Sequence, residues 1–181
     1  MISRISSNIA DFIRANNDRA ASKEVLMFSI GIFLNTFIVT AIILGVSLIT
    51  GRFWYAAGLL VSYVLLRFFS GGMHLPSSTL CNIVSVGVFV IVTHLPINWD
   101  NVGLILNILA LIFVAIYAPT KDVTTLSWFG PKYGLHFKIL CIFIVLSNFL
   151  MKSPMLSVAF FVQALTLLPI SYKFAALFER R

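Results

Sequence analysis

Charged residues are scarce in this chain, and their scarcity excludes a large class of proteins. Asp, Glu, Lys and Arg make up 10% of the 181 residues, whereas a soluble domain carries about 25%. Hydrophobic residues make up 60%, and the mean hydropathy is +1.00. A water-soluble globule is therefore excluded, and most of the surface must face lipid. The apolar runs show no alternation of apolar and polar residues, which favours membrane helices over a β-barrel.

Acidic residues are fewer still, and none lies in the middle of an apolar run. The six are Asp11, Asp18, Glu24, Asp100, Asp122 and Glu179. Ion-coupled transporters and intramembrane aspartyl or glutamate-dependent metal peptidases place such groups inside their spans, so the sequence argues against all of them. The Gly-x-Ser-Gly motif of a rhomboid-like serine protease is also absent. We expect no metal and no cofactor, because the sequence around the histidine and cysteine discussed below supplies too few ligands.

Apolar runs of membrane-spanning length are what the chain has in abundance. Six can be drawn, at residues 25–50, 53–69, 80–97, 102–118, 135–151 and 155–172. About 20 residues span the hydrocarbon core of a bilayer, with a range of roughly 17–25. The sequence therefore predicts an all-α polytopic membrane protein, forming a single domain over residues 1–181 with a six-helix bundle at 25–172.

A separate amphipathic helix is expected over residues 1–23. Its apolar residues recur at helical spacings of three and four. They are Ile2, Ile5, Ile9, Phe12 and Ile13. This pattern predicts a helix lying on the membrane surface, with a frayed polar terminus as the alternative. The stretch lacks the apolar core of a secretory signal, so we do not expect one.

The basic residues indicate how the bundle is oriented. All but two of the 13 Lys and Arg residues fall on the N-terminal side of the membrane, and the exceptions are Arg52 and Lys152. The positive-inside rule then places both termini in the cytoplasm, together with residues 67–81 and the loop at 119–134. This bias accounts for the net charge of +7, so no nucleic-acid partner is expected.

The stretch 67–81, RFFSGGMHLPSSTLC, contains residues that a simple turn between two helices does not need. On one continuous helix, His74 and Cys81 would stand two turns apart, about 10.5 Å along the axis. That separation is too large for proton transfer. The glycine pair at 71–72 lets the backbone leave helical geometry, and Pro76 prevents the helix from continuing. The chain can then fold back, bringing His74 as general base beside Cys81 as nucleophile.

Two serines precede the cysteine and suit the start of a new helix. Ser77 or Ser78 would cap it, which places Cys81 in its first turn. Unpaired backbone N–H groups and the helix dipole favour an anion there, either a thiolate or the oxyanion formed on an attacked carbonyl. The alternative is a buried structural cysteine beside an ordinary turn. We prefer that structural interpretation for Cys141, which lies within the fifth apolar run.

A wider pattern surrounds this pair. Arg67, Gly71, Gly72, His74 and Cys81 match R-x3-GG-x-H-x6-C. In this pattern, its length and its six apolar runs, the chain resembles the AgrB (accessory gene regulator protein B) family of bacterial membrane cysteine endopeptidases. The sequence Tyr-Ala-Pro that ends the fourth run before a basic loop is a further likeness.

The resemblance implies a function. His74 and Cys81 would be the catalytic pair that cleaves an AgrD-like precursor peptide at the cytoplasmic face of the bacterial cell membrane. Cleavage would pass through a thioester acyl-enzyme, and a cysteine of the peptide would then close a thiolactone ring, giving a cyclic quorum-sensing signal. The family also implies a homodimer, and Gly31, Gly45 and Gly58 are candidates for close packing at its interface.

Supporting roles are less determined by the sequence. Arg67 could hold an acidic substrate tail or a lipid phosphate, or act only as a positive anchor. Asp122, Ser70 and Asn82 are candidates to orient the imidazole of His74. Two rival functions remain, a non-enzymatic membrane scaffold and a transporter of small solutes or peptides.

Overall fold

The computed structural model describes residues 2–17, 20–73, 78–120 and 131–179, and every regular element within these ranges is helical. This confirms the all-α prediction. The longer helices are α1 (Ile2–Asn16), α2 (Lys23–Ile49), α3 (Phe53–Ser70), α4 (Ser78–His94), α5 (Leu104–Tyr117), α7 (Gly134–Met151), α8 (Pro154–Leu165) and α9 (Pro169–Glu179). Two short helical turns, η1 (Trp99–Gly103) and η2 (Pro131–Tyr133), precede α5 and α7.

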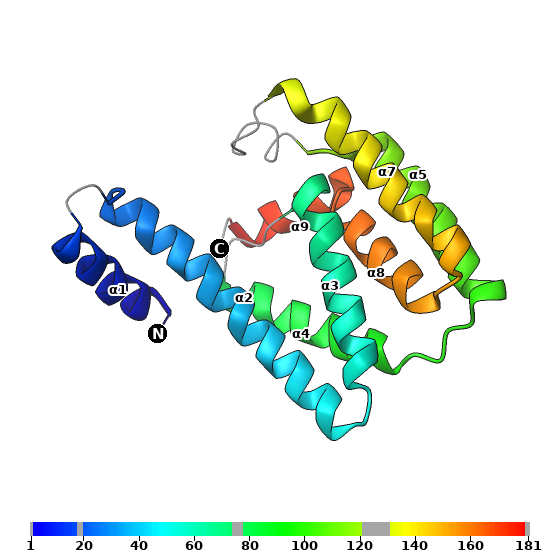
Figure 1. Cartoon of the computed structure of the whole chain (residues 1–181), viewed down its shortest axis with the longest axis horizontal. Coiled ribbons are helices and arrows are strands. Elements are labelled where there is room, and N and C mark those ends of the chain that lie inside the picture. Colours follow the sequence, from blue (N-terminus) through cyan, green and yellow to red (C-terminus); the bar gives the residue numbers. More distant parts are fainter. Residues whose placement is uncertain (1, 18–19, 74–77, 121–130, 180–181) are drawn as a thin grey trace.

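Helix α8 is the centre of the bundle (Figure 1). One apolar cluster joins it to α3, α5 and α7, through residues such as Leu66, Val114 and Phe160. A second cluster joins α8 and α3 to α2 and α4, through residues such as Ile43 and Phe89. Since α3 and α8 contribute to both clusters, their relative position determines where the other helices pack.

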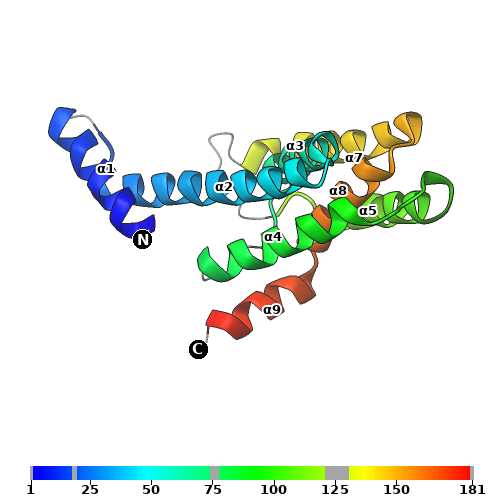
Figure 2. The ribbon, with the colours of Figure 1, turned by 90° about the horizontal axis from the view of Figure 1, so that it is seen from below.

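Helix α1 packs against the N-terminal half of α2, and both views show this pair extending away from the rest of the bundle (Figures 1 and 2). Lys23 donates to Asp11 at 2.7 Å across the turn between them. Ala10 is buried, while Phe12 of the predicted apolar face is 71% exposed. The N-terminal helix is thus present but ends at Asn16, short of the predicted residue 23.

Helices of membrane-spanning length are fewer than the six apolar runs. Within the described ranges, four helical segments are long and apolar enough to cross a membrane by themselves, Lys23–Ile49, Phe53–Ser70, Trp99–Tyr117 and Gly134–Met151. A fifth is obtained if α8 and α9 count together. Helix α4 is shorter than predicted for the third run, because it ends at His94 rather than at residue 97.

The prediction of one continuous sixth helix over 155–172 is wrong. Helix α8 ends at Leu165, α9 begins at Pro169, and the two are bent by 63°. Proline cannot donate a backbone hydrogen bond and its ring blocks the preceding turn, so Pro169 can start a helix but not continue one. The N–H groups of residues 166–168 instead form short turn bonds, such as that from Thr166 to the carbonyl of Gln163 at 3.0 Å.

Helix ends meet at two opposite ends of the bundle. At the first, which we call the glycine end (residues 70–73, 118–120 and 166–168), Thr120 N–H donates to Ser70 O at 2.9 Å, and Met73 N–H donates to Thr166 O at 3.0 Å. At the opposite end, Arg52 donates to Thr93 O at 3.3 Å. The stretches starting at 67 and 119, predicted to share one membrane face, therefore do lie together where they are described.

The opposite end also holds a buried amide cluster between α5, α7 and α8. Asn148 Nδ2 lies 3.0 Å from Asn107 Oδ1, 3.0 Å from Ser157 Oγ and 3.1 Å from Ser153 O, so its two N–H groups are shared among three acceptors. Its side-chain oxygen Oδ1 accepts from Ser153 N–H at 3.0 Å. Because polar groups away from water need partners, this cluster fixes how α7 turns into α8.

Replacing Asn148 with Leu should lower the free energy of unfolding by about 1–3 kcal/mol, since several buried partners lose their hydrogen bonds together. The measurement is thermal or denaturant unfolding of the purified chain in detergent. Leu150→Ala is the control, because Leu150 is 88% exposed near the end of the same helix. Equal effects of the two substitutions would contradict a stabilising role for the amide cluster.

Candidate active site

The helical structure is interrupted between α3 and α4, at the position that the sequence predicts; we call this interruption the chain break. Gly71 caps α3 with φ 74° and ψ −145°, and its N–H donates to Arg67 O at 2.8 Å. Gly72 follows with φ 133°. Residues other than glycine rarely adopt such backbone angles, so the glycine pair allows the chain to leave the helix axis abruptly.

Cys81 lies in the first turn of the next helix. Helix α4 begins at Ser78, so Cys81 is its fourth residue, as a free and partly exposed thiol. His74 and Ser77 lie outside the described residues, so the pairing of His74 with Cys81 and the capping by serine stay predictions.

Arg67 holds the chain that leaves the glycine pair. Its Nη2 donates to Met73 O at 2.9 Å, one residue before His74. Its Nη1 lies 3.2 Å from Tyr63 Oη, 3.4 Å from Gln163 Oε1 and 3.5 Å from Thr166 Oγ1. Arg67 thus links α3 and α8 to the segment that leads to His74, a more specific arrangement than a plain positive anchor.

Gln163 is the residue of this site that sequence reasoning missed. It is fully buried on α8, and its Nε2 donates to Gly71 O at 2.6 Å and to Ser70 Oγ at 2.9 Å. A sequence signal did exist, since Gln163 is an uncharged polar residue within the sixth apolar run, and such residues within membrane helices form interhelical hydrogen bonds. Its partners, however, could not be read from the sequence.

Gly72 is surrounded closely by the same residues. A Cβ atom built on it would collide with the Thr166 side chain and would lie 3.3 Å from Arg67 Nη1. Both its backbone angle and the space around it therefore require glycine. The predicted supporting residues Arg67, Gly71 and Gly72 form one hydrogen-bonded and packed unit with α8.

The residues that follow α5 also form part of the glycine end. Ala118 is buried in the same cluster as Leu66 and Leu167, and Thr120 pairs with Ser70 as described above. The Tyr-Ala-Pro sequence therefore packs beside the chain break. Asp122 lies in the loop beyond it, outside the described residues, so its predicted role is not tested.

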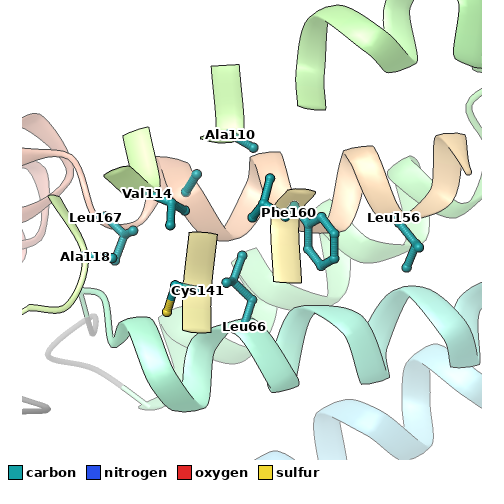
Figure 3. Close-up of a cluster of buried hydrophobic side chains, with 10 residues drawn as sticks. Leu66, Ala110, Val114, Ala118, Cys141, Leu156, Phe160 and Leu167 are labelled. Atoms are coloured by element: carbon teal, nitrogen blue, oxygen red, sulfur yellow. The ribbon is translucent and has the colours of Figure 1, made fainter. Parts of the chain in front are cut away.

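The second cysteine has a different environment. Cys141 is fully buried on α7 within the apolar cluster formed with α3, α5 and α8 (Figure 3). Such surroundings suit a structural thiol. Among the residues that the structure describes, no three His, Cys, Asp or Glu side chains are grouped so that they could hold a metal ion.

Comparison with known proteins identifies the family. The family described as Accessory gene regulator B matches residues 6–171, which include the chain break and Cys81. The chain belongs to the AgrB family. This membership places it in the context of accessory gene regulation and confirms the resemblance found in the sequence pattern.

Alignments with known relatives cover most of the chain. A putative AgrB-like protein of Halalkalibacterium halodurans is 26% identical over 178 residues, which span 96% of this chain and 90% of that protein. Accessory gene regulator protein B of Staphylococcus aureus is 31% identical, over 83% of this chain and 76% of its own. That of Staphylococcus saprophyticus is also 31% identical, over 83% and 85%. No solved structure matches the chain.

Replacing Gly72 with Ala should destabilise the glycine end by about 2–4 kcal/mol, because the new methyl group adds a collision with Thr166 to an unfavourable backbone angle. Gly51→Ala is the matched control. Gly51 also has a positive φ, of 71°, but no atom lies within 4 Å of its would-be Cβ. It should cost only about 1 kcal/mol. Unfolding in detergent measures both, and equal costs would contradict crowding at Gly72.

Proposed function

We propose that this chain is a membrane-embedded cysteine endopeptidase that cleaves a small AgrD-like precursor peptide at the cytoplasmic membrane face. The observation that carries the proposal is the position of Cys81. It is a partly exposed thiol in the first turn of α4, just after a chain break held by Arg67. Membership of the AgrB family and the R-x3-GG-x-H-x6-C pattern support it.

The proposed reaction begins with proton transfer from the Cys81 thiol to His74. The thiolate attacks a backbone carbonyl carbon of the precursor, and N–H groups at the start of α4 bind the oxyanion. The carbon–nitrogen bond then breaks, and the leaving amine takes the proton from His74. A thioester joins the N-terminal part of the peptide to Cys81. A cysteine thiol within the peptide attacks this thioester, releases Cys81 and closes a thiolactone ring.

We propose a six-crossing topology with both termini in the cytoplasm. Support comes from the alternation of helix ends: α3, α5 and α8 all end at the glycine end, while α2, α4 and α7 end at the opposite one. Helix α8 has 12 residues, about 18 Å, which is shorter than the roughly 30 Å hydrocarbon core. It is largely buried among its neighbours, and in this proposal it makes the last crossing as a short helix. The distribution of basic residues supports a cytoplasmic position for the glycine end.

Two further parts of the proposal concern surfaces. Helix α1 lies at the membrane interface, where its exposed apolar residues meet lipid while Asp11 and Lys23 pair. The chain acts as a homodimer. Gly58 is a poor candidate for that interface, because its would-be Cβ lies 2.7 Å from Met155 Cε of the same chain. Gly31 and Gly45 have no atom within 4 Å of theirs and remain available.

Replacing Cys81 with Ala should abolish cleavage of a co-expressed precursor peptide, a loss of at least about 100-fold, because no other group can form the acyl-enzyme. His74→Ala should have a comparable effect. Cys141→Ala is the control and should leave cleavage intact, since that thiol lies in the apolar core. Peptide processing is followed by mass spectrometry. Continued cleavage by the Cys81→Ala variant would refute the peptidase proposal.

Thiol labelling distinguishes the enzyme from a membrane scaffold or transporter. Iodoacetamide should label Cys81 at least about 10-fold faster than Cys141, which is buried in the apolar core, and also faster than a free cysteine, because in the proposed reaction His74 takes the proton of the Cys81 thiol. Site-specific labelling of the intact chain is measured by mass spectrometry after digestion. Labelling of Cys81 no faster than that of free cysteine would favour the scaffold.

A further inference from the structure

We propose that Gln163 is a positioning residue for the catalytic segment, acting through Gly71 and Arg67. This inference rests on the peptidase function proposed above and adds to it a residue outside the sequence pattern. Gln163 comes from the sixth apolar run, 92 residues beyond Gly71, to whose carbonyl it donates.

The orientation of the Gln163 amide follows from the chemistry of its partners. Its Oε1 accepts from the Arg67 guanidinium at 3.4 Å, and a guanidinium can only donate. Its Nε2 donates to Gly71 O at 2.6 Å, and a carbonyl can only accept. A flipped amide would place donor against donor and acceptor against acceptor. The amide thus bridges the last turn of α3 and the chain that leaves it.

The bridge fixes the direction in which the chain leaves α3. The carbonyl of Gly71 follows a positive φ, and a glycine pair has more backbone freedom than other residues. Gln163 restrains the first peptide group of the break, and Arg67 restrains Met73 O at its other end. His74 is the next residue, so these two restraints set where its backbone begins.

The burial of Gln163 distinguishes a positioning role for this residue from a role in substrate binding. The Gln163 side chain is 0% exposed, so it cannot touch a peptide bound at the surface. Its loss should therefore lower kcat while leaving KM nearly unchanged. A residue that bound the substrate would instead raise KM.

The central test assays two Gln163 variants of the full-length chain, and one control variant, on the precursor peptide in membranes. Gln163→Met keeps the length of the side chain and removes both polar ends, and Gln163→Glu keeps the acceptor for Arg67 but replaces the donor to Gly71 with an acceptor. Both should lower kcat by about 10-fold to 100-fold, the effect of losing one or two buried hydrogen bonds, with KM within about 3-fold of the original.

Asn148→Leu is the matched control for loss of stability. It also removes a fully buried amide with several hydrogen bonds, but at the opposite end of the bundle. It should lower the unfolding temperature while leaving kcat within about 2-fold at temperatures where the chain is folded. An equal loss of kcat in Asn148→Leu and Gln163→Met would show a general effect of destabilisation and overturn the positioning role.

A second readout needs no substrate. The rate at which iodoacetamide alkylates Cys81 in the folded chain should fall about 3-fold or more in Gln163→Met, because a displaced His74 activates the thiol less well. An unchanged rate, or an unchanged kcat beside an inactive Cys81→Ala variant, would overturn the positioning role alone. Cleavage that persists in Cys81→Ala would instead overturn the peptidase function, and the inference with it.

Discussion

A helix that ends inside a membrane protein leaves backbone carbonyls without partners, and lipid supplies none. At the end of α3 the partners come from three directions. Gln163 of α8 binds the carbonyl of Gly71, the N–H of Thr120 binds that of Ser70, and the capping N–H of Gly71 binds that of Arg67. The rest of the site depends on this junction, because both the glycine pair and the segment leading to His74 start from it.

The junction also explains why α8 is short. If α8 continued as one helix to residue 172, the backbone carbonyl of Thr166 would accept from an N–H within the helix, which would compete with the bond from Met73 N–H. The break before Pro169 frees that carbonyl at the depth where the chain leaves α3. The bend of 63° thus leaves Thr166 O available to the segment that leaves α3, and α9 continues in a different direction (Figure 2).

The two cysteines of the chain have different surroundings because they occupy different positions along their helices. Cys141 lies in the middle of α7, where neighbouring helices cover it, and Cys81 lies where a helix begins beside the chain break. The first position buries a thiol among apolar side chains. The second leaves it partly exposed, in the first turn of α4.

Much of the fold could be predicted because the signals are local. Apolar runs indicate spans, a glycine pair followed by proline indicates a break, and serines before Cys81 indicate a new helix; α3 and α4 end and begin within a residue or two of these signals. The prediction failed at the sixth run, where apolar composition outweighed Pro169. It also placed the end of the N-terminal helix too late, because it did not use Ser22, which caps the start of α2 by accepting from Val25 N–H, as a boundary signal.

The sequence by itself determined the membrane class, the chain break and the family pattern, because composition and short spacings carry that information. Only the tertiary structure decided what holds the break in place. Arg67 is nearly a hundred residues away from Gln163 and Thr166, and it meets them only because α3 and α8 share both apolar clusters. Hydrogen bonds across such a distance depend on helix packing, and no local pattern encodes them.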